Sequence, residues 1–200
     1  MRILKATADN ILATSKIVRM GGLVVYPTDT VYGIGCDPLN VEAVKLIFKT
    51  KGERKKPLPI LASDVKHVEK IAHLSERARK IAAIFWPGPL TIVVPKKPAL
   101  SDVVTCNLGS VGVRVPRHNI ALQLIHLSKG LIVGTSANKT GKKPPLTAYE
   151  AAEQLGKEVN IILDGGPTAL GKPSTVVDLT SRKFKILRKG PIHLKDILQV

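Results

Sequence analysis

Short apolar runs alternate with segments of helical periodicity along nearly the whole chain, and this alternation most constrains the fold. Runs typical of buried strands cover residues 23–26, 90–94, 111–115, 131–133, 161–163, 175–179 and 185–187. Helices are expected after capping residues at Thr7, Asn40, Ser75 and Thr147, over residues 120–127 and from His193. Interleaved helices and strands predict an α/β fold. The closely spaced last three strands predict that part of the sheet is antiparallel.

Length and composition predict one domain covering residues 1–200. Hydrophobic residues make up 44% of the 200 residues, which is typical of a globular protein. A chain of this length buries roughly 70% of its unfolded surface in a single core. No repeat, linker or long uncharged apolar run interrupts the pattern. We therefore expect a single twisted sheet, mixed parallel and antiparallel, with flanking helices and no membrane span.

The charge of the chain is strongly unbalanced. Lysine and arginine number 31 against 15 aspartate and glutamate residues, a formal net charge of +16. This excess favours an anionic partner such as nucleic acid, a membrane surface or a phosphorylated small molecule. Aromatic residues, at 4%, are too scarce for stacking several bases of a single strand. Two cysteines without a CxxC pair, and histidines without metal-ligand spacing, predict reduced thiols in a cytoplasmic protein and no zinc site.

Two glycine-rich segments come close to nucleotide-binding motifs. Residues 166–172 read GPTALGK, the opening of a phosphate-binding P-loop, but Pro173 stands where Ser or Thr should follow. The next residues are strand-like, so a connection between strands is the better interpretation. Gly33-x-Gly35 lacks the third glycine of the dinucleotide fingerprint.

Two further segments place polar residues beside predicted elements. Residues 26–35, YPTDTVYGIG, end a buried strand in hydroxyls, a carboxylate and glycines. They predict either a ligand site at a strand end or a polar turn in which Asp29 bonds its own backbone. Residues 49–56 carry five cations in eight positions after a helix. They predict either a solvated helix end or a triphosphate site.

The strand at residues 110–117, SVGVRVPR, holds an arginine among apolar residues. Alternation places Val111, Val113 and Val115 on one face, and Ser110, Gly112 and Arg114 on the other. An arginine in such a strand requires an anion, which favours a functional role for Arg114. The small polar residues at 134–138, GTSAN, follow another strand and predict either phosphate donors or a capping loop.

Taken together, these segments resemble the YrdC-like family in its short, single-domain form. PTDTVYGIG, KGER/KKPL, WPGPLT, SVGVRVP, GTSAN, STVVDLT and ILRKGP occur in the family's order, from about residue 23 to 191. The resemblance implies a twisted α/β fold with a deep basic cleft. It also implies a nucleotidyltransferase reaction, in which L-threonine, bicarbonate or CO2, and ATP give threonylcarbamoyl-AMP and pyrophosphate. A partner transferase complex would then modify tRNA to threonylcarbamoyladenosine, and a tRNA contact by this chain is a further expectation.

The resemblance also implies roles for individual residues. Three side chains would contact the threonine: Thr30, Arg114 and Ser174. The residues implied to line the ATP site are Arg54, Lys56, Ser110, Gly134, Ser136, Asn138 and Arg188. Lys51 and Arg54 are the candidate catalytic contacts to the phosphates. Mg²⁺ is expected to accompany ATP, without metal ligands from protein side chains.

The sequence departs from the family pattern in two places. Two residues separate Lys51 from Arg54 where the family usually has one, so the arginine role falls to Arg54 or a neighbour. Leu61 stands where many longer members have histidine. One alternative function is a non-catalytic module that binds double-stranded RNA or tRNA. A second, a carbamoyl-phosphate enzyme, would carry zinc-finger-like cysteine motifs that this sequence lacks.

Overall fold

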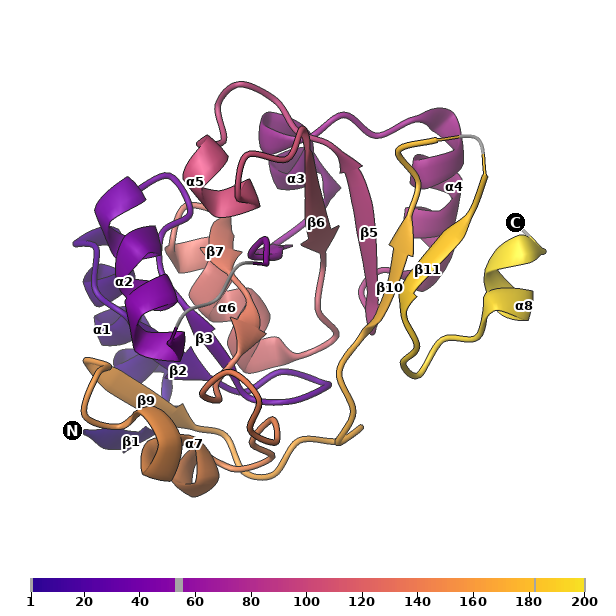
Figure 1. The fold of residues 1–200 in the computed structure, drawn as a ribbon. Coiled ribbons are helices and arrows are strands. Elements are labelled where there is room, and N and C mark those ends of the chain that lie inside the picture. Colours follow the sequence, from indigo (N-terminus) through magenta and orange to yellow (C-terminus); the bar gives the residue numbers. More distant parts are fainter. Residues whose placement is uncertain (1, 53–55, 182, 200) are drawn as a thin grey trace.

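A computed structural model describes residues 2–52, 56–181 and 183–199 of the chain. The elements in chain order are β1 (Ile3–Lys5), α1 (Ala8–Arg19), β2 (Val24–Tyr26), β3 (Gly33–Gly35), α2 (Val41–Lys51), β4 (Ile60–Ala62), α3 (Val65–Ile71), α4 (Glu76–Phe85), β5 (Leu90–Pro95), α5 (Asp102–Thr105), β6 (Ser110–Arg114), α6 (Asn119–Leu127), β7 (Leu131–Val133), β8 (Thr135–Ser136), α7 (Ala148–Leu155), β9 (Ile161–Asp164), β10 (Thr175–Asp178), β11 (Lys185–Arg188) and α8 (Leu194–Leu198). The N-terminal strand and the C-terminal helix lie at opposite ends of the molecule (Figure 1).

The strands form two mixed sheets rather than the single sheet that the sequence led us to expect. A five-stranded sheet has the order β1-β9-β2-β3-β8, and a six-stranded sheet has the order β11-β10-β5-β6-β4-β7. The last hairpin, β10 with β11, is antiparallel as predicted, whereas β10 pairs parallel with β5. The predicted α/β class, with mixed strand directions and flanking helices, is confirmed.

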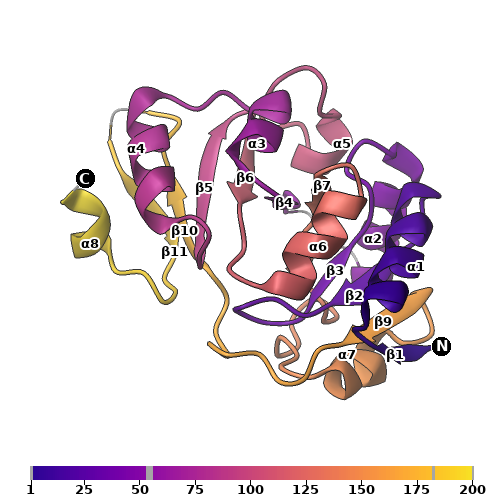
Figure 2. The same cartoon turned by 180° about the vertical axis from the view of Figure 1, so that it is seen from behind.

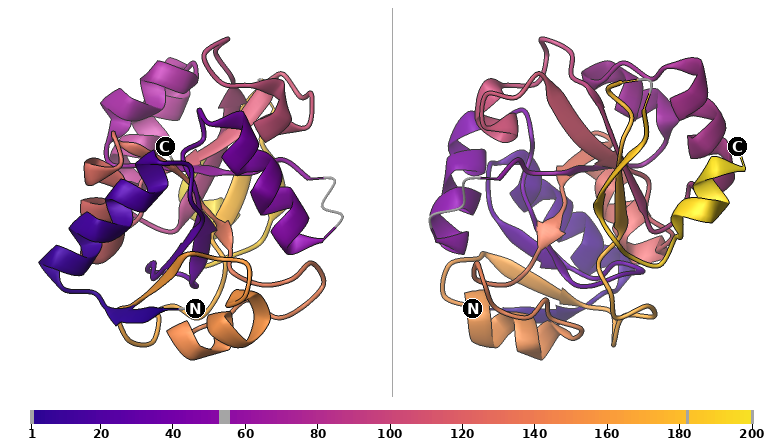
Figure 3. Two further views of the ribbon diagram at one scale, coloured as in Figure 1. Left: turned by 90° about the vertical axis from the view of Figure 1, so that its left-hand side faces the viewer. Right: turned by 45° about the vertical axis from the view of Figure 1, so that its right-hand side comes forward.

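Helices cover both sheets. Helices α1 and α7 both contact β9 and β2, and they lie on opposite faces of the five-stranded sheet (Figure 3). Helix α6 packs against α1 and β4, and α4 packs against β5 of the six-stranded sheet (Figure 2). Within the part of the chain that the structure describes, no helix has the length and apolar character needed to cross a bilayer.

Local capping explains where the predicted helices begin. The side chains of Thr7, Asn40 and Ser75 each accept a hydrogen bond from the backbone N–H three residues later. Thr147 caps α7 in the same way, through the N–H of Glu150 at 3.2 Å. In a complete capping box the Glu150 carboxylate would accept from the N–H of Thr147. Here it accepts instead from the N–H of Leu146, one residue earlier, so only the Thr147 half of the predicted capping box is formed.

One apolar cluster joins the two sheets. Val25 and Ile34 of the five-stranded sheet belong to the same buried cluster as Ile60, Ile92 and Val113 of the six-stranded sheet. A second cluster lies beneath α1 and α6, on the opposite face of β2 and β9. The shared cluster fixes the position of one sheet against the other, and the polar face of β6 is left toward a cavity.

Candidate active site

A cavity of about 460 Å³ lies where the two sheets meet. The six-stranded sheet contributes residues of β4, β5, β6, β10 and β11, and the five-stranded sheet contributes the β2–β3 turn and β8. Eight of the predicted site residues line it: Thr30, Lys56, Ser110, Arg114, Gly134, Ser136, Ser174 and Arg188. Segments separated by more than a hundred residues therefore meet at one place, while the individual roles of these residues remain predictions.

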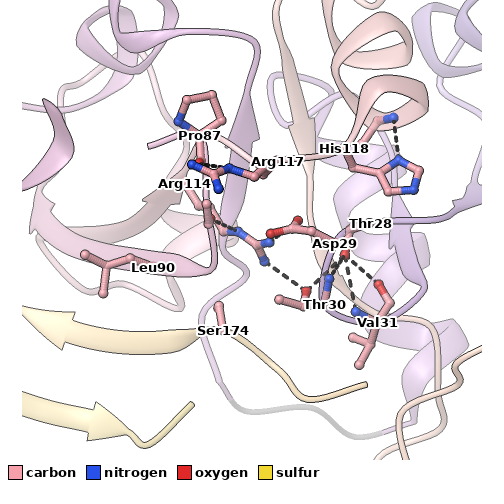
Figure 4. Close-up of polar contacts among 12 residues, drawn as sticks. Thr28, Asp29, Thr30, Val31, Pro87, Leu90, Arg114, Arg117, His118 and Ser174 are labelled. Carbon is pink, nitrogen blue, oxygen red and sulfur yellow. Dashed lines mark hydrogen bonds and ion pairs between the residues drawn. The ribbon is translucent and has the colours of Figure 1, made fainter. Parts of the chain in front are cut away.

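Arg114 occupies the centre of the site, on the face of β6 that the alternation predicted. It is only 4% exposed, and its Nη2 donates to the Asp29 carboxylate (Figure 4). Its Nη1 donates to Thr30 Oγ1 at 3.0 Å and its Nε donates to the carbonyl of Gly88 at 2.8 Å. The anion that the buried arginine requires is thus present in the protein itself, and it is Asp29.

The Arg114–Asp29 pair is almost completely removed from water. The two side chains are 5% and 8% exposed. Burial lowers the pKa of the Arg114 guanidinium, and the negative charge of Asp29 opposes that shift. Among the described residues, no hydrogen-bond partner reaches the second carboxylate oxygen, Oδ2 of Asp29. The polar turn foreseen for residues 26–35 therefore holds the arginine instead of folding Asp29 onto its own backbone.

The threonine hydroxyls of this turn are ordered by the backbone. Thr28 Oγ1 donates to the carbonyl of Val31 at 2.7 Å and accepts from the N–H groups of Thr30 and Val31. It also lies 3.0 Å from Thr30 Oγ1. The two N–H groups fill both lone pairs of Thr28 Oγ1 and Val31 takes its proton, so the contact with Thr28 uses no lone pair of Thr30 Oγ1. Thr30 Oγ1 then keeps one lone pair beyond the one that Arg114 uses, and can accept from a ligand.

Ser174 lies on the opposite side of the cavity between two partners. Arg188 donates from Nη2 to Ser174 Oγ and from Nε to the Ser174 carbonyl, both at 2.9 Å. The hydroxyl of Thr91 lies 2.8 Å from Ser174 Oγ. Arg188 therefore holds Ser174 from the β11 side, and Thr91 touches it from β5.

Lys51 is buried against the 134–138 segment, and its contact to the phosphates stays a prediction. It is 2% exposed, and its Nζ donates to the carbonyls of Ser136 at 2.5 Å and Asn138 at 2.7 Å. The side-chain amide of Asn138 in turn donates to the carbonyls of Lys139 and Lys142. Among the described residues that line the cavity, neither Lys51 nor Asn138 is found. Lys51 therefore holds the backbone of the 134–138 segment, and the Asn138 amide ties the end of that segment to residues 139–142.

The remaining predicted site positions differ in what the structure shows of them. Arg54 lies outside the described residues, so its role stays a prediction. Leu61 is 3% exposed, lines the cavity and packs against Gly134. The described lining contains three cationic side chains, those of Lys56, Arg114 and Arg188, and one carboxylate, that of Asp178. The deep basic cleft itself stays a prediction.

Thr91 and Asp178 also line the cavity, and neither was predicted from the sequence. Both follow from strand alternation: Thr91 and Val93 must face away from the buried Leu90 and Ile92, and Asp178 shares a face of β10 with Val176. The pairing of Asp29 with Arg114 had no local signal, because the two residues are 85 positions apart.

The fold and the cavity define a class of protein. The model of the Sua5/YciO/YrdC family, described as "Telomere recombination", matches residues 16–190. The chain belongs to this family, which confirms the resemblance seen in the sequence.

Within this family, the chain is similar over most of its length to several named relatives. The chain is 43% identical over 185 residues to a threonylcarbamoyl-AMP synthase of Pyrococcus abyssi, covering 92% of this chain and 54% of that protein. It is 37% identical over 197 residues to a threonylcarbamoyl-AMP synthase of Bacillus subtilis, covering 97% and 57%. A crystal structure of P. abyssi Sua5 complexed with L-threonine superposes with a TM-score of 0.96 at 40% identity, covering 100% of this chain and 60% of that one. The chain thus spans little more than half the length of these relatives.

Proposed function

We propose that this chain is an L-threonylcarbamoyladenylate synthase that condenses L-threonine, bicarbonate and ATP. One observation carries the proposal: Arg114, Thr30 and Ser174, the residues implied to hold threonine, meet at one cavity from three separate segments. Lys56 and Arg188, implied to hold ATP, line the same cavity. The printed names of the relatives, and the L-threonine in the P. abyssi structure, support the same assignment.

The amino acid would bind at Arg114. Of the five N–H groups of its guanidinium, three donate to described residues, which leaves two for a ligand carboxylate. Thr30 Oγ1 offers a lone pair to the ammonium or hydroxyl group of the same ligand. The Asp29 charge next to Arg114 keeps the site from holding a bare buried cation before the carboxylate arrives.

The nucleotide would occupy the remainder of the cavity. Lys56 and Arg188 supply positive charge for phosphate oxygens, and Ser110 and Ser136 supply hydroxyls. A volume of about 460 Å³ falls within the range of ligand pockets, roughly 300 to 1,000 Å³. Mg²⁺ would arrive with ATP, because this ion is commonly held by substrate phosphates with few protein carboxylates.

The proposed reaction has two steps. Threonine, as the ammonium form, and bicarbonate give a carbamate, water and one proton. A carbamate oxygen then bonds to the α-phosphorus of ATP while the bond to the leaving pyrophosphate breaks. Both reactants are anionic, so the chief task of the protein is to hold them together and offset their repulsion, which the cations of the cavity would do.

Pyrophosphate release tests the proposal directly. We expect the purified chain to release pyrophosphate when ATP, L-threonine and bicarbonate are all present. Omitting threonine or bicarbonate should reduce the rate to background. Release that does not depend on threonine, or no release at all, would overturn the proposal.

The alternative of a non-catalytic RNA-binding module predicts a different outcome. Such a module would bind double-stranded RNA or tRNA with an affinity that falls steeply with salt, and would release no pyrophosphate. Transfer to tRNA by a partner complex, direct tRNA contact and a cytoplasmic location belong to the proposal and await their own tests. Adding tRNA to the pyrophosphate assay, and measuring binding over a salt series, separates the two functions.

A further inference from the structure

Thr91 is a buried polar residue of the cavity that the proposed mechanism does not use. It lies on β5 and is 4% exposed, yet it lines the cavity. Its hydroxyl oxygen lies 2.8 Å from Ser174 Oγ, across the junction of β5 and β10. A buried hydroxyl is stabilised only when it is hydrogen-bonded, and Ser174 is the partner that the structure shows for it.

The orientation of the Thr91 side chain is fixed by its neighbour on β6. Gly112 has no side chain, and a Cβ added there would lie 3.2 Å from Thr91 Cγ2. The methyl group of Thr91 therefore occupies the space beside Gly112, and its hydroxyl is turned toward Ser174. A β-branched side chain with one arm packed in this way has little freedom to rotate.

The hydrogen bonds of Ser174 decide what its proton can do. A serine hydroxyl has one proton and two acceptor lone pairs. Arg188 Nη2 donates to Ser174 Oγ at 2.9 Å and uses one lone pair. The Thr91–Ser174 contact allows either hydroxyl to donate, but Ser174 Oγ is the acceptor that the described residues offer to the buried Thr91 proton. With Thr91 as the donor, both lone pairs of Ser174 are filled, and the proton of Ser174 is free for an acceptor in the cavity.

We propose that Thr91 is a positioning residue that makes Ser174 a hydrogen-bond donor to an oxygen of the amino-acid substrate. The inference rests on the proposed function, because Ser174 is the implied threonine contact. Thr91 acts through Ser174 and does not itself touch the reacting atoms. Its effect therefore falls on the affinity for threonine more than on the chemical step.

Two substitutions separate the hydroxyl of Thr91 from its methyl group. Thr91→Val keeps the shape and removes the hydroxyl, whereas Thr91→Ser keeps the hydroxyl and removes the methyl. With ATP and bicarbonate saturating, we expect Thr91→Val to raise the KM for threonine about five- to tenfold, the range of one lost hydrogen bond. The kcat should change less than about twofold, and Thr91→Ser should recover most of the lost affinity.

A double-mutant cycle with Ser174→Ala checks that Thr91 acts through Ser174. In the Ser174→Ala background, Thr91→Val should raise the KM for threonine by less than about twofold further. A full additional effect in that background would overturn the inference. So would a Thr91→Val protein with wild-type KM, or a Thr91→Ser protein as impaired as Thr91→Val. Should Thr91→Val fail to fold, Thr91→Ala compared with Thr91→Ser isolates the same hydroxyl.

The wild-type protein separates this inference from the proposed function. If wild-type protein releases no threonine-dependent pyrophosphate, the proposed function fails. If wild-type protein is active and Thr91→Val leaves its KM for threonine unchanged, only the role of Thr91 fails.

Discussion

The buried pair of Arg114 and Asp29 is the residue-scale feature on which the site depends. Each charge has lost most of its hydration, and the pair is held by Thr30 and Gly88 as well as by mutual attraction. An incoming carboxylate would meet an arginine whose charge is already balanced. The ligand would therefore share the guanidinium with Asp29 rather than neutralise it for the first time.

Removing one partner of this pair should cost stability as well as function. We expect Arg114→Ala to lower the free energy of unfolding by about 3 to 5 kcal/mol, because Asp29 is left as an unpaired buried charge. Threonine-dependent pyrophosphate release should be lost through a raised KM for threonine. Urea unfolding and steady-state kinetics measure the two effects.

A double variant separates the two effects. Arg114→Met with Asp29→Asn removes both charges, and should recover most of the unfolding free energy without recovering activity. Recovery of threonine-dependent release in the double variant would show that Arg114 has only a structural role.

At the scale of secondary structure, predictability follows the locality of the interactions. The helices after Thr7, Asn40 and Ser75 were predictable because each cap bonds a backbone group three residues away. The facing of β6 was predictable from its alternation of valine with polar residues. Strands β1, β3, β4 and β8 were missed, because their pairing is determined by partners far away in the chain rather than by a local pattern.

In the candidate site too, features set by local sequence were predictable and contacts between distant residues were not. Arg114 was correctly placed on the polar face of its strand, since that depends on the strand alone. Its partner Asp29, and the contact of Thr91 with Ser174, join residues 85 and 83 positions apart. The position of Lys51 behind the 134–138 segment likewise depends on how α2 packs in the finished fold. No local pattern could have supplied these contacts.

Helix α2 offers a matched test of the role of Lys51. We expect Lys51→Met to lower the free energy of unfolding by about 2 kcal/mol or more, because its buried ammonium group bonds two carbonyls. Lys45→Met on the same helix should change it by less than about 0.5 kcal/mol, since its ion pair with Glu42 is exposed. Chemical denaturation measures both. Equal effects would mean that Lys51 does not brace the 134–138 segment.

The cap of helix α6 should make stability depend on pH. His118 Nδ1 accepts from the N–H of Ala121 at 3.4 Å, which requires a neutral ring nitrogen (Figure 4). Burial lowers the pKa of His118, and the Asp29 charge only partly opposes this. The unfolded chain then binds the proton more readily, so His118 contributes stability above pH about 6.5 that is lost as the pH falls.

A substitution at His118 measures this contribution. Between pH 7.5 and 5.5, the free energy of unfolding should fall less in His118→Asn than in wild type, because asparagine caps a helix without titrating in this range. Parallel pH profiles for the two proteins would contradict the assignment.

At the scale of the whole molecule, one apolar cluster connects the two sheets. Val25 and Ile34 on one side and Ile60, Ile92 and Val113 on the other are all buried in it. The cavity lies over this connection and takes residues from both sheets. Neither sheet alone carries the complete site, so its geometry requires the whole domain to be folded.

The shared cluster predicts cooperative unfolding. Trp86 is the one tryptophan of the chain, is 8% exposed and donates from its indole to the carbonyl of Leu90 beside the six-stranded sheet. We expect its fluorescence to change at the same urea concentration as the far-ultraviolet circular dichroism of the whole chain. Separate midpoints would show that the sheets unfold independently.

The two hydrogen bonds from Arg188 to Ser174 connect the implied sites of the two substrates. A phosphate that draws Arg188 toward itself changes the free energy of any ligand bound to Ser174. Thermodynamic linkage then requires a reciprocal effect: the factor by which ATP changes the affinity for threonine equals the factor by which threonine changes the affinity for ATP. Calorimetric titration of each substrate, with and without the other, measures this shared factor.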